Sequence, residues 1–184
     1  MVYLIGGPPR CGKSELAQRL TKEGWLTFVP TDLLWAVLEV ALPDWRPPIP
    51  KGPDRLLKAG NMFQPYLEHA VQFLDRLRQP FGIEGEVILP ETVARLRSNV
   101  DLRAVFLIRS AATAADMADP RGPNPWLYSA DPNLIASVAA EAVSWSIRVE
   151  QACQRLQIAC FDVGNDFDHA LRDAARTLGA DGRA

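Results

Sequence analysis

Short apolar runs alternate along the chain with longer stretches in which apolar residues recur at helical spacing. The runs at residues 2–5, 25–29, 87–89, 104–108 and 158–163 predict five buried strands. Strands that alternate with helices are typical of a parallel sheet covered by helices on both faces. The pattern therefore predicts an α/β fold with three layers, built as a single domain over residues 1–184.

Capping residues indicate where several of the helices begin. Thr31 or Asp32 can cap the helix that follows the second predicted strand. Asp131 precedes a proline and a long apolar periodicity, an arrangement typical of an N-cap with proline at the first helical position. Asn165 or Asp166 can cap the last helix. These boundaries leave no room for a second domain.

Two proline-rich stretches interrupt the regular pattern. Residues 43–53 contain five prolines, and residues 119–132 contain four prolines and one glycine. Proline removes a backbone donor and fixes φ, so both stretches are expected to be irregular surface segments. Residues 109–132 as a whole lack a clear period and predict a covering loop.

Composition excludes several classes of protein. The chain has 20 basic and 22 acidic residues, which gives no support for a general nucleic-acid or acidic-membrane binder. Its three cysteines form no Cys-x-x-Cys pair, so neither a disulfide framework nor a structural zinc site is expected. No apolar run approaches the roughly 20 residues that span a bilayer, and the start does not resemble a signal peptide. We therefore expect a cytoplasmic protein.

A complete G-x-x-x-x-G-K-[ST] motif occupies residues 7–14, between the first predicted strand and a helix expected from about Gly12. Glycines let such a loop wrap an anion, so that successive amide N–H groups and the helix N-terminus face phosphates. Lys13 can reach the β- and γ-phosphates, and the Ser14 hydroxyl can bind magnesium. The motif predicts a site for ATP with Mg²⁺; ATP is favoured over GTP because the sequence has no Asn-Lys-x-Asp element.

Two prolines in the motif restrict which residues can donate. Pro8 and Pro9 have no N–H, so the donors are expected mainly from the residues after them. The residues predicted to bind the nucleotide are Gly7, Arg10, Cys11, Gly12, Lys13, Ser14 and Glu15, with Ser14 also the metal ligand.

The first 32 residues resemble a known family. The motif, its preceding strand and the later Val29-Pro30-Thr31-Asp32 are similar to the small P-loop kinases, the group of nucleoside monophosphate kinases, chloramphenicol phosphotransferase and zeta toxins. The resemblance implies a five-stranded parallel core with the P-loop strand central. It also implies a lid at about residues 109–132 and an acceptor pocket shaped by about residues 33–79.

The resemblance also suggests catalytic residues. Asp32 matches the aspartate that takes the hydroxyl proton in members that phosphorylate a hydroxyl, although it could simply cap a helix. Glu91 fits a Walker B-like acid or, equally, a first-turn helix acid. Arg109 and Arg121 in the lid could neutralise charge in the transition state, or be solvated. Lys13, Asp32 and Arg121 form the predicted catalytic set.

These features lead to one main hypothesis and a rival. The main hypothesis is a kinase that moves the γ-phosphoryl group of ATP to a small-molecule acceptor, with a hydroxyl favoured by Asp32. The rival is a P-loop ATPase or regulatory nucleotide-binding module without transfer activity. Four basic residues of the acceptor segment would suit an acidic or phosphorylated acceptor, or belong to a solvated face: Arg46, Lys51, Arg55 and Lys58.

Overall fold

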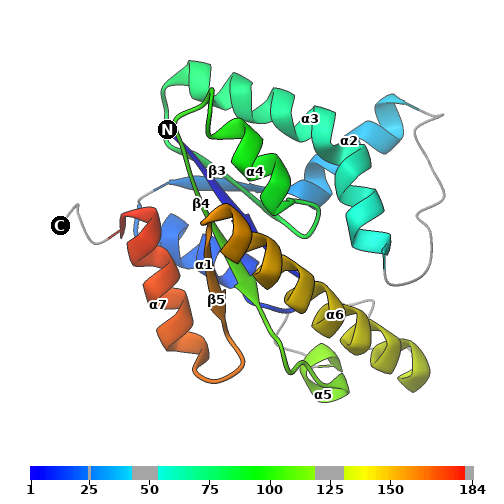
Figure 1. Ribbon diagram of the computed structural model, residues 1–184. Helices are drawn as coiled ribbons and strands as arrows, with labels where there is room; N and C mark the ends of the chain where they lie inside the picture. Colours follow the sequence, from blue (N-terminus) through cyan, green and yellow to red (C-terminus); the bar gives the residue numbers. More distant parts are fainter. Residues whose placement is uncertain (25, 43–53, 119–130, 181–184) are drawn as a thin grey trace.

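Five parallel strands form one sheet at the centre of the computed structural model, which describes residues 1–24, 26–42, 54–118 and 131–180 (Figure 1). The strand order is β2-β3-β1-β4-β5, so the strand that leads into the P-loop motif is central. The strands are β1 (Val2–Gly6), β2 (Thr27–Pro30), β3 (Phe81–Gly85), β4 (Leu102–Ile108) and β5 (Ala159–Asp162). The predicted α/β fold with a five-stranded parallel sheet is confirmed.

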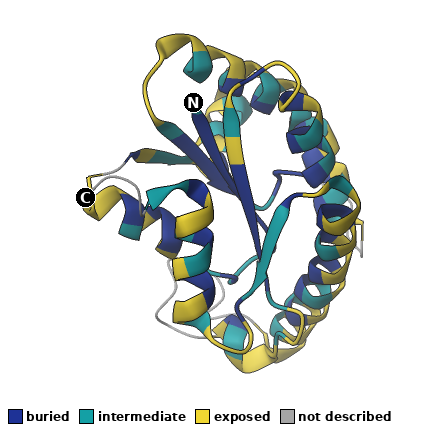
Figure 2. Ribbon diagram, turned by 60° about the vertical axis from the view of Figure 1, so that its left-hand side comes forward, coloured by how far each residue is buried: buried dark blue, intermediate teal, exposed yellow. Residues whose placement is uncertain are grey.

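Seven helices lie among the described residues: α1 (Lys13–Lys22), α2 (Thr31–Ala41), α3 (Arg55–Leu77), α4 (Pro90–Leu96), α5 (Ala114–Ala118), α6 (Pro132–Leu156) and α7 (Phe167–Leu178). Alternate residues of β1 enter two separate cores. Val2 and Leu4 pack with α3, α4 and α6, whereas Tyr3 and Ile5 pack with α1 and α7. Figure 2 shows most of β1 and β4 buried and the outer sides of the helices exposed. Because both faces of the sheet are buried by helices, the fold has three layers.

The third strand was predicted at the wrong place. β3 covers Phe81–Gly85, whereas residues 87–89 lie in the connection to α4. Those three residues are apolar because the connection itself is buried in the core beneath α3. The true strand carries Gly82 and Gly85, which leave space for Phe28 and Thr31 of the β2–α2 unit. The hydrophobic pattern therefore predicted a strand in the buried connection and missed the true strand, which contains glycines.

Helix ends and proline positions were predicted with mixed success. Asp131 and Asp166 cap α6 and α7 by accepting from Asn133 and His169 backbone N–H groups, as expected. The cap expected from Thr31 or Asp32 is wrong, because Pro30 is the N-cap of α2 and no side chain caps it. The segment predicted to be irregular from residue 109 contains the short helix α5. Its remainder over 119–130 lies outside the described residues.

The packing of α3 against α2 gives a first testable prediction. Phe63 of α3 is fully buried and stacks on Trp35 of α2 with a centroid distance of 5.9 Å. Phe63→Ala is expected to lower the free energy of unfolding by about 3–5 kcal/mol, because a large cavity replaces the ring. Phe73→Ala on the same helix is the control, since that ring is 50% exposed. Chemical denaturation measures both, and equal losses would contradict the assigned packing.

None of the helices in the described ranges is long and apolar enough to cross a membrane.

Candidate functional site

The P-loop motif connects β1 to α1 at the carboxyl edge of the sheet. Gly7 and Gly12 have φ values of 138° and 89°, conformations that glycine adopts without strain. A Cβ at Gly7 would lie 1.9 Å from the backbone oxygen of Leu107, so no side chain fits there. Gly12 is the N-cap of α1 and offers no capping side chain. The first N–H groups of α1 are therefore left for an anion, as the motif predicts.

Lys13 folds back across the loop. Its ammonium donates to the carbonyl oxygen of Pro8 at 2.7 Å, and its side chain is almost fully buried. Burial opposes the charged form of Lys13, but the neighbouring Cys11, followed by Glu86, Glu84 and Asp32, outweighs it and the pKa is raised. The ammonium thus remains charged and is held where phosphates would enter the loop.

Cys11 turns its side chain into the core. Its thiol is fully buried and donates to the carbonyl oxygen of Pro8 at 2.9 Å. Burial raises the pKa of this thiol above its ordinary value, which makes it a poor nucleophile at neutral pH. The predicted nucleotide-binding role of Cys11 consequently rests on its backbone N–H alone.

A carboxylate that the sequence analysis missed lies next to Ser14. The Ser14 hydroxyl donates to Glu84 Oε1 at 3.1 Å, and Glu84 is buried at the end of β3, beside Ile5 of β1. Burial raises the pKa of the Glu84 carboxyl. In the sequence, Glu84 is the acid at the end of the short run of residues 81–84. This run did not stand out as a strand, because the more apolar residues 87–89 were predicted to form it.

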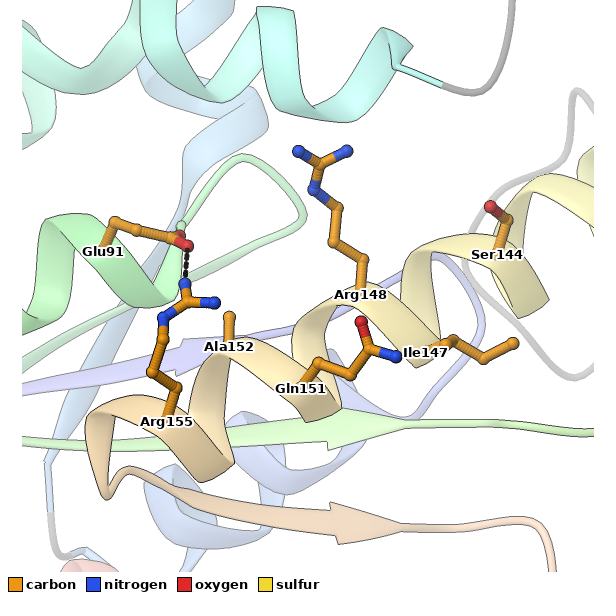
Figure 3. Close-up of a pocket in the computed structure, with 7 residues that line it drawn as sticks. All are labelled: Glu91, Ser144, Ile147, Arg148, Gln151, Ala152 and Arg155. Carbon is orange, nitrogen blue, oxygen red and sulfur yellow. Dashed lines mark hydrogen bonds and ion pairs between the residues drawn. The ribbon is translucent and has the colours of Figure 1, made fainter.

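Glu91 does not occupy this position. It lies in the first turn of α4, as the alternative interpretation had it, and pairs with Arg155 of α6 at 2.9 Å. Figure 3 shows this pair at one end of an open pocket of about 430 Å³, whose lining residues belong to α4 and α6. Arg148, on the same side of α6, pairs with Asp54 at 3.1 Å. The acid beside Ser14 is therefore Glu84.

Asp32 is in the first turn of α2, directly after β2. Its side chain is exposed and makes no capping hydrogen bond, so the helix-cap alternative has no support in the structure. It is close enough to Lys13, Glu84 and Glu86 to influence their pKa values. The carboxylate at the end of the second strand thus lies within electrostatic range of the P-loop lysine.

Only one of the two arginines of the predicted lid, Arg109, belongs to the described residues. Arg109 follows β4, where its backbone exchanges hydrogen bonds of 3.1 Å with the Ser146 hydroxyl of α6. Its guanidinium pairs with Asp116 of α5. Arg121, the predicted catalytic arginine, lies outside the described residues.

Magnesium would rely on few protein ligands. Within residues 1–24, 26–42, 54–118 and 131–180, no three His, Cys, Asp or Glu side chains are grouped to hold a metal ion. Mg²⁺ commonly takes one or two protein oxygens and completes its shell with substrate phosphates and water. Ser14 and Glu84 fit that kind of site, because their oxygens meet at 3.1 Å beside the loop.

No family model matches the chain, and no curated protein matches it. Solved structures do. The chain is similar to a gluconokinase from Sinorhizobium meliloti 1021, with 16% identity over 97% of this chain and 91% of that chain and a TM-score of 0.58. A shikimate kinase from Bacteroides thetaiotaomicron shares 12% identity over 98% and 97% of the two chains, with a TM-score of 0.57.

A third solved structure extends the same group. The thymidylate kinase from Candida albicans shares 15% identity over 98% of this chain and 91% of that chain, with a TM-score of 0.53. At these identities the likeness shows the fold alone. The chain has the three-layer fold of small P-loop kinases, and its chemistry must be inferred from its own residues.

Proposed function

We propose that this protein is an ATP-dependent phosphotransferase that moves the γ-phosphoryl group to the hydroxyl of a small-molecule acceptor. One observation carries the proposal: Asp32 is exposed at the end of β2, makes no capping hydrogen bond, and lies close enough to Lys13 of a complete P-loop to influence its pKa. Phosphoryl transfer to a hydroxyl requires two groups: a loop that holds the phosphates, and a nearby carboxylate that can accept the proton of the hydroxyl.

Each residue has a defined role in this proposal. The N–H groups of residues 10–15 bind the phosphates, and Lys13 moves from the Pro8 carbonyl to the β- and γ-phosphates. Ser14 and Glu84 would hold Mg²⁺, which would supply positive charge to offset that of the phosphates. The acceptor oxygen attacks the γ-phosphorus, the bond from γ-phosphorus to the bridging oxygen breaks, and ADP leaves. Asp32 orients the hydroxyl and receives its proton.

The names of two similar structures, gluconokinase and shikimate kinase, support this proposal. The rival is a P-loop ATPase or nucleotide-binding module without transfer. The experiment that separates them is ATP turnover with and without a metabolite extract. A kinase accelerates strongly when its acceptor is present, an ATPase turns over equally in both, and a binding module turns over in neither.

The metal-binding role of Ser14 and Glu84 gives a second prediction. Ser14→Ala and Glu84→Gln are each expected to weaken ATP binding in the presence of Mg²⁺ by roughly 10- to 100-fold, because the metal loses a ligand or its support. With EDTA present the same variants should bind ATP nearly as the parent does. Calorimetry under both conditions measures the difference.

A matched control for these variants is Glu91→Gln, which removes the exposed carboxylate of α4 that pairs with Arg155. It should leave ATP affinity unchanged with and without the metal. Equal losses for Ser14→Ala in Mg²⁺ and in EDTA would make the serine structural and remove it from the metal site.

A further inference from the structure

One residue of the P-loop adopts a conformation that does not suit its side chain. Gly7 and Gly12 have φ values of 138° and 89°, and Arg10 between them has a φ of 61°. Glycine enters this left-handed region without strain, whereas a residue with a Cβ is disfavoured there. Arg10 therefore occupies a position of the loop that glycine would fit better.

Two other non-glycine residues of the described ranges have positive φ, and both end a helix. Arg78, with a φ of 54°, is the C-cap of α3, and Gln157, with a φ of 53°, is the C-cap of α6. A left-handed residue is common at a helix end, where it helps to satisfy the last carbonyl groups. Arg10 ends no helix. An unfavourable conformation kept inside a binding loop suggests that the side chain contributes to function.

The Arg10 side chain begins where the loop holds phosphates. Arg10 is the first residue after Gly7 that has a backbone N–H, because Pro8 and Pro9 have none. The residue is only partly exposed, and its Nε atom is shielded from solvent, so the side chain does not extend freely into water. An arginine that starts within the loop is long enough to reach the phosphate chain that the loop holds.

The phosphates need more positive charge than Lys13 supplies. Residues 7–14 contain one basic residue besides Lys13, namely Arg10. Directly after the lysine, the Ser14 hydroxyl donates to the buried carboxylate of Glu84 at 3.1 Å, and this negative charge partly offsets the ammonium. A triphosphate and a carboxylate together carry more negative charge than one lysine and one magnesium ion neutralise. A second cation within the loop would lower that excess.

We propose that the guanidinium of Arg10 binds the phosphate chain of the nucleotide, as a second cation beside Lys13. Its planar fork of N–H groups can donate two parallel hydrogen bonds to phosphate oxygens, which the point charge of a lysine cannot do. The contact with phosphate would compensate the unfavourable φ of residue 10. This inference rests on the proposed function, which assigns the loop to ATP and uses only the backbone N–H of Arg10.

The variant Arg10→Gly tests the side chain and relieves the backbone at the same time. It is expected to weaken ATP binding by roughly 10- to 100-fold, the usual strength of hydrogen bonds between charged groups. The melting temperature should stay the same or rise, because glycine accepts positive φ. Calorimetric titration at a temperature where parent and variant are both folded measures affinity. Unchanged ATP affinity would overturn the inference, whatever the melting temperature.

Inorganic tripolyphosphate is the probe that identifies the part of the nucleotide involved. The parent is expected to bind it, and Arg10→Gly should weaken that binding by a factor similar to the one for ATP. A loss seen with ATP while parent and variant bind tripolyphosphate equally would place the guanidinium on the nucleoside, and would overturn the inference. Arg10→Asn is the second variant, because asparagine tolerates positive φ and has no charge. It should lose the same affinities.

The matched control is Arg78→Gly, which also replaces an arginine of positive φ by glycine. Arg78 is exposed and precedes the amino end of β3, whereas the P-loop follows the carboxyl end of the parallel strand β1. Its melting temperature should stay the same or rise, and its ATP affinity should not change. An equal loss of affinity in this control would overturn the assignment of Arg10.

The outcomes separate this inference from the function on which it rests. Lys13→Ala is compared with Arg10→Gly in the same titrations. Weakened ATP binding in Lys13→Ala but not in Arg10→Gly would overturn the role of Arg10 and leave the P-loop as the nucleotide site. Absence of ATP binding by the parent protein would instead overturn the proposed function, and this inference with it.

Discussion

Lys13→Ala is expected to nearly abolish activity, with phosphoryl transfer reduced by at least roughly 10²–10³-fold, as when a preorganised charge-stabilising donor is lost. ATP affinity should fall as well, because the lysine of a P-loop reaches the β- and γ-phosphates, and the Lys13 ammonium now donates to the Pro8 carbonyl within that loop. Calorimetry with ATP and Mg²⁺ measures binding, and single-turnover kinetics measure transfer.

The control for this variant is Lys22→Ala. Lys22 is in the last turn of the same helix, and its side chain is exposed. Removing its charge should change neither affinity nor rate. If Lys13→Ala retained the affinity and turnover of the parent, the P-loop would not be the nucleotide site.

Asp32→Asn is expected to separate binding from chemistry. The amide keeps the size of the side chain, and no capping hydrogen bond is lost because Asp32 makes none. ATP affinity and stability should therefore persist. Transfer should fall by roughly 10²–10⁴-fold, the usual contribution of general acid–base help. A loose transition state favours the lower end, since little proton transfer is then needed early.

The outcomes for Asp32→Asn identify its role. A loss of ATP affinity that depends on Mg²⁺ would assign Asp32 to the metal rather than to the acceptor. Near-normal transfer would remove it from the catalytic set, and with it the main reason for a hydroxyl acceptor. Asp168→Asn is the control, because Asp168 is the corresponding first-turn acid of α7 and is exposed.

The P-loop could be predicted because its chemistry is local. A strand, glycines at fixed spacing, Lys13 and Ser14 are contiguous in the sequence, so the motif specifies its own geometry. The order of strands and helices was predictable for the same reason, because each apolar run by itself indicates a buried segment. The two aspartate caps, Asp131 and Asp166, are local signals too.

The position of β3 could not be predicted from hydrophobicity. The strand tolerates Gly82 and Gly85 because Phe28 and Thr31 fill the space beside them, a contact between segments over fifty residues apart. The buried connection that follows is more apolar than the strand itself. This one error moved the expected acid from Glu84 to Glu91, which shows how a site assignment depends on strand placement.

The ion pairs of Arg55 have no sequence signature. Arg55, Glu86 and Glu141 belong to α3, the β3–α4 connection and α6, and only the fold brings them together. From the sequence, Arg55 was equally consistent with binding an acidic acceptor. Its pairing with Glu141 could not be predicted from the sequence, because the two residues are 86 positions apart.

The most direct test of the central proposal follows the phosphoryl group itself. The protein is incubated with Mg²⁺, a metabolite extract and ATP labelled in the γ-phosphoryl group with radioactive phosphorus, and the products are separated by chromatography. The proposal predicts a labelled organic phosphate that forms with the parent protein and is strongly reduced with Asp32→Asn. Label found only in inorganic phosphate, at the same rate with and without the extract, would contradict it and establish an ATPase.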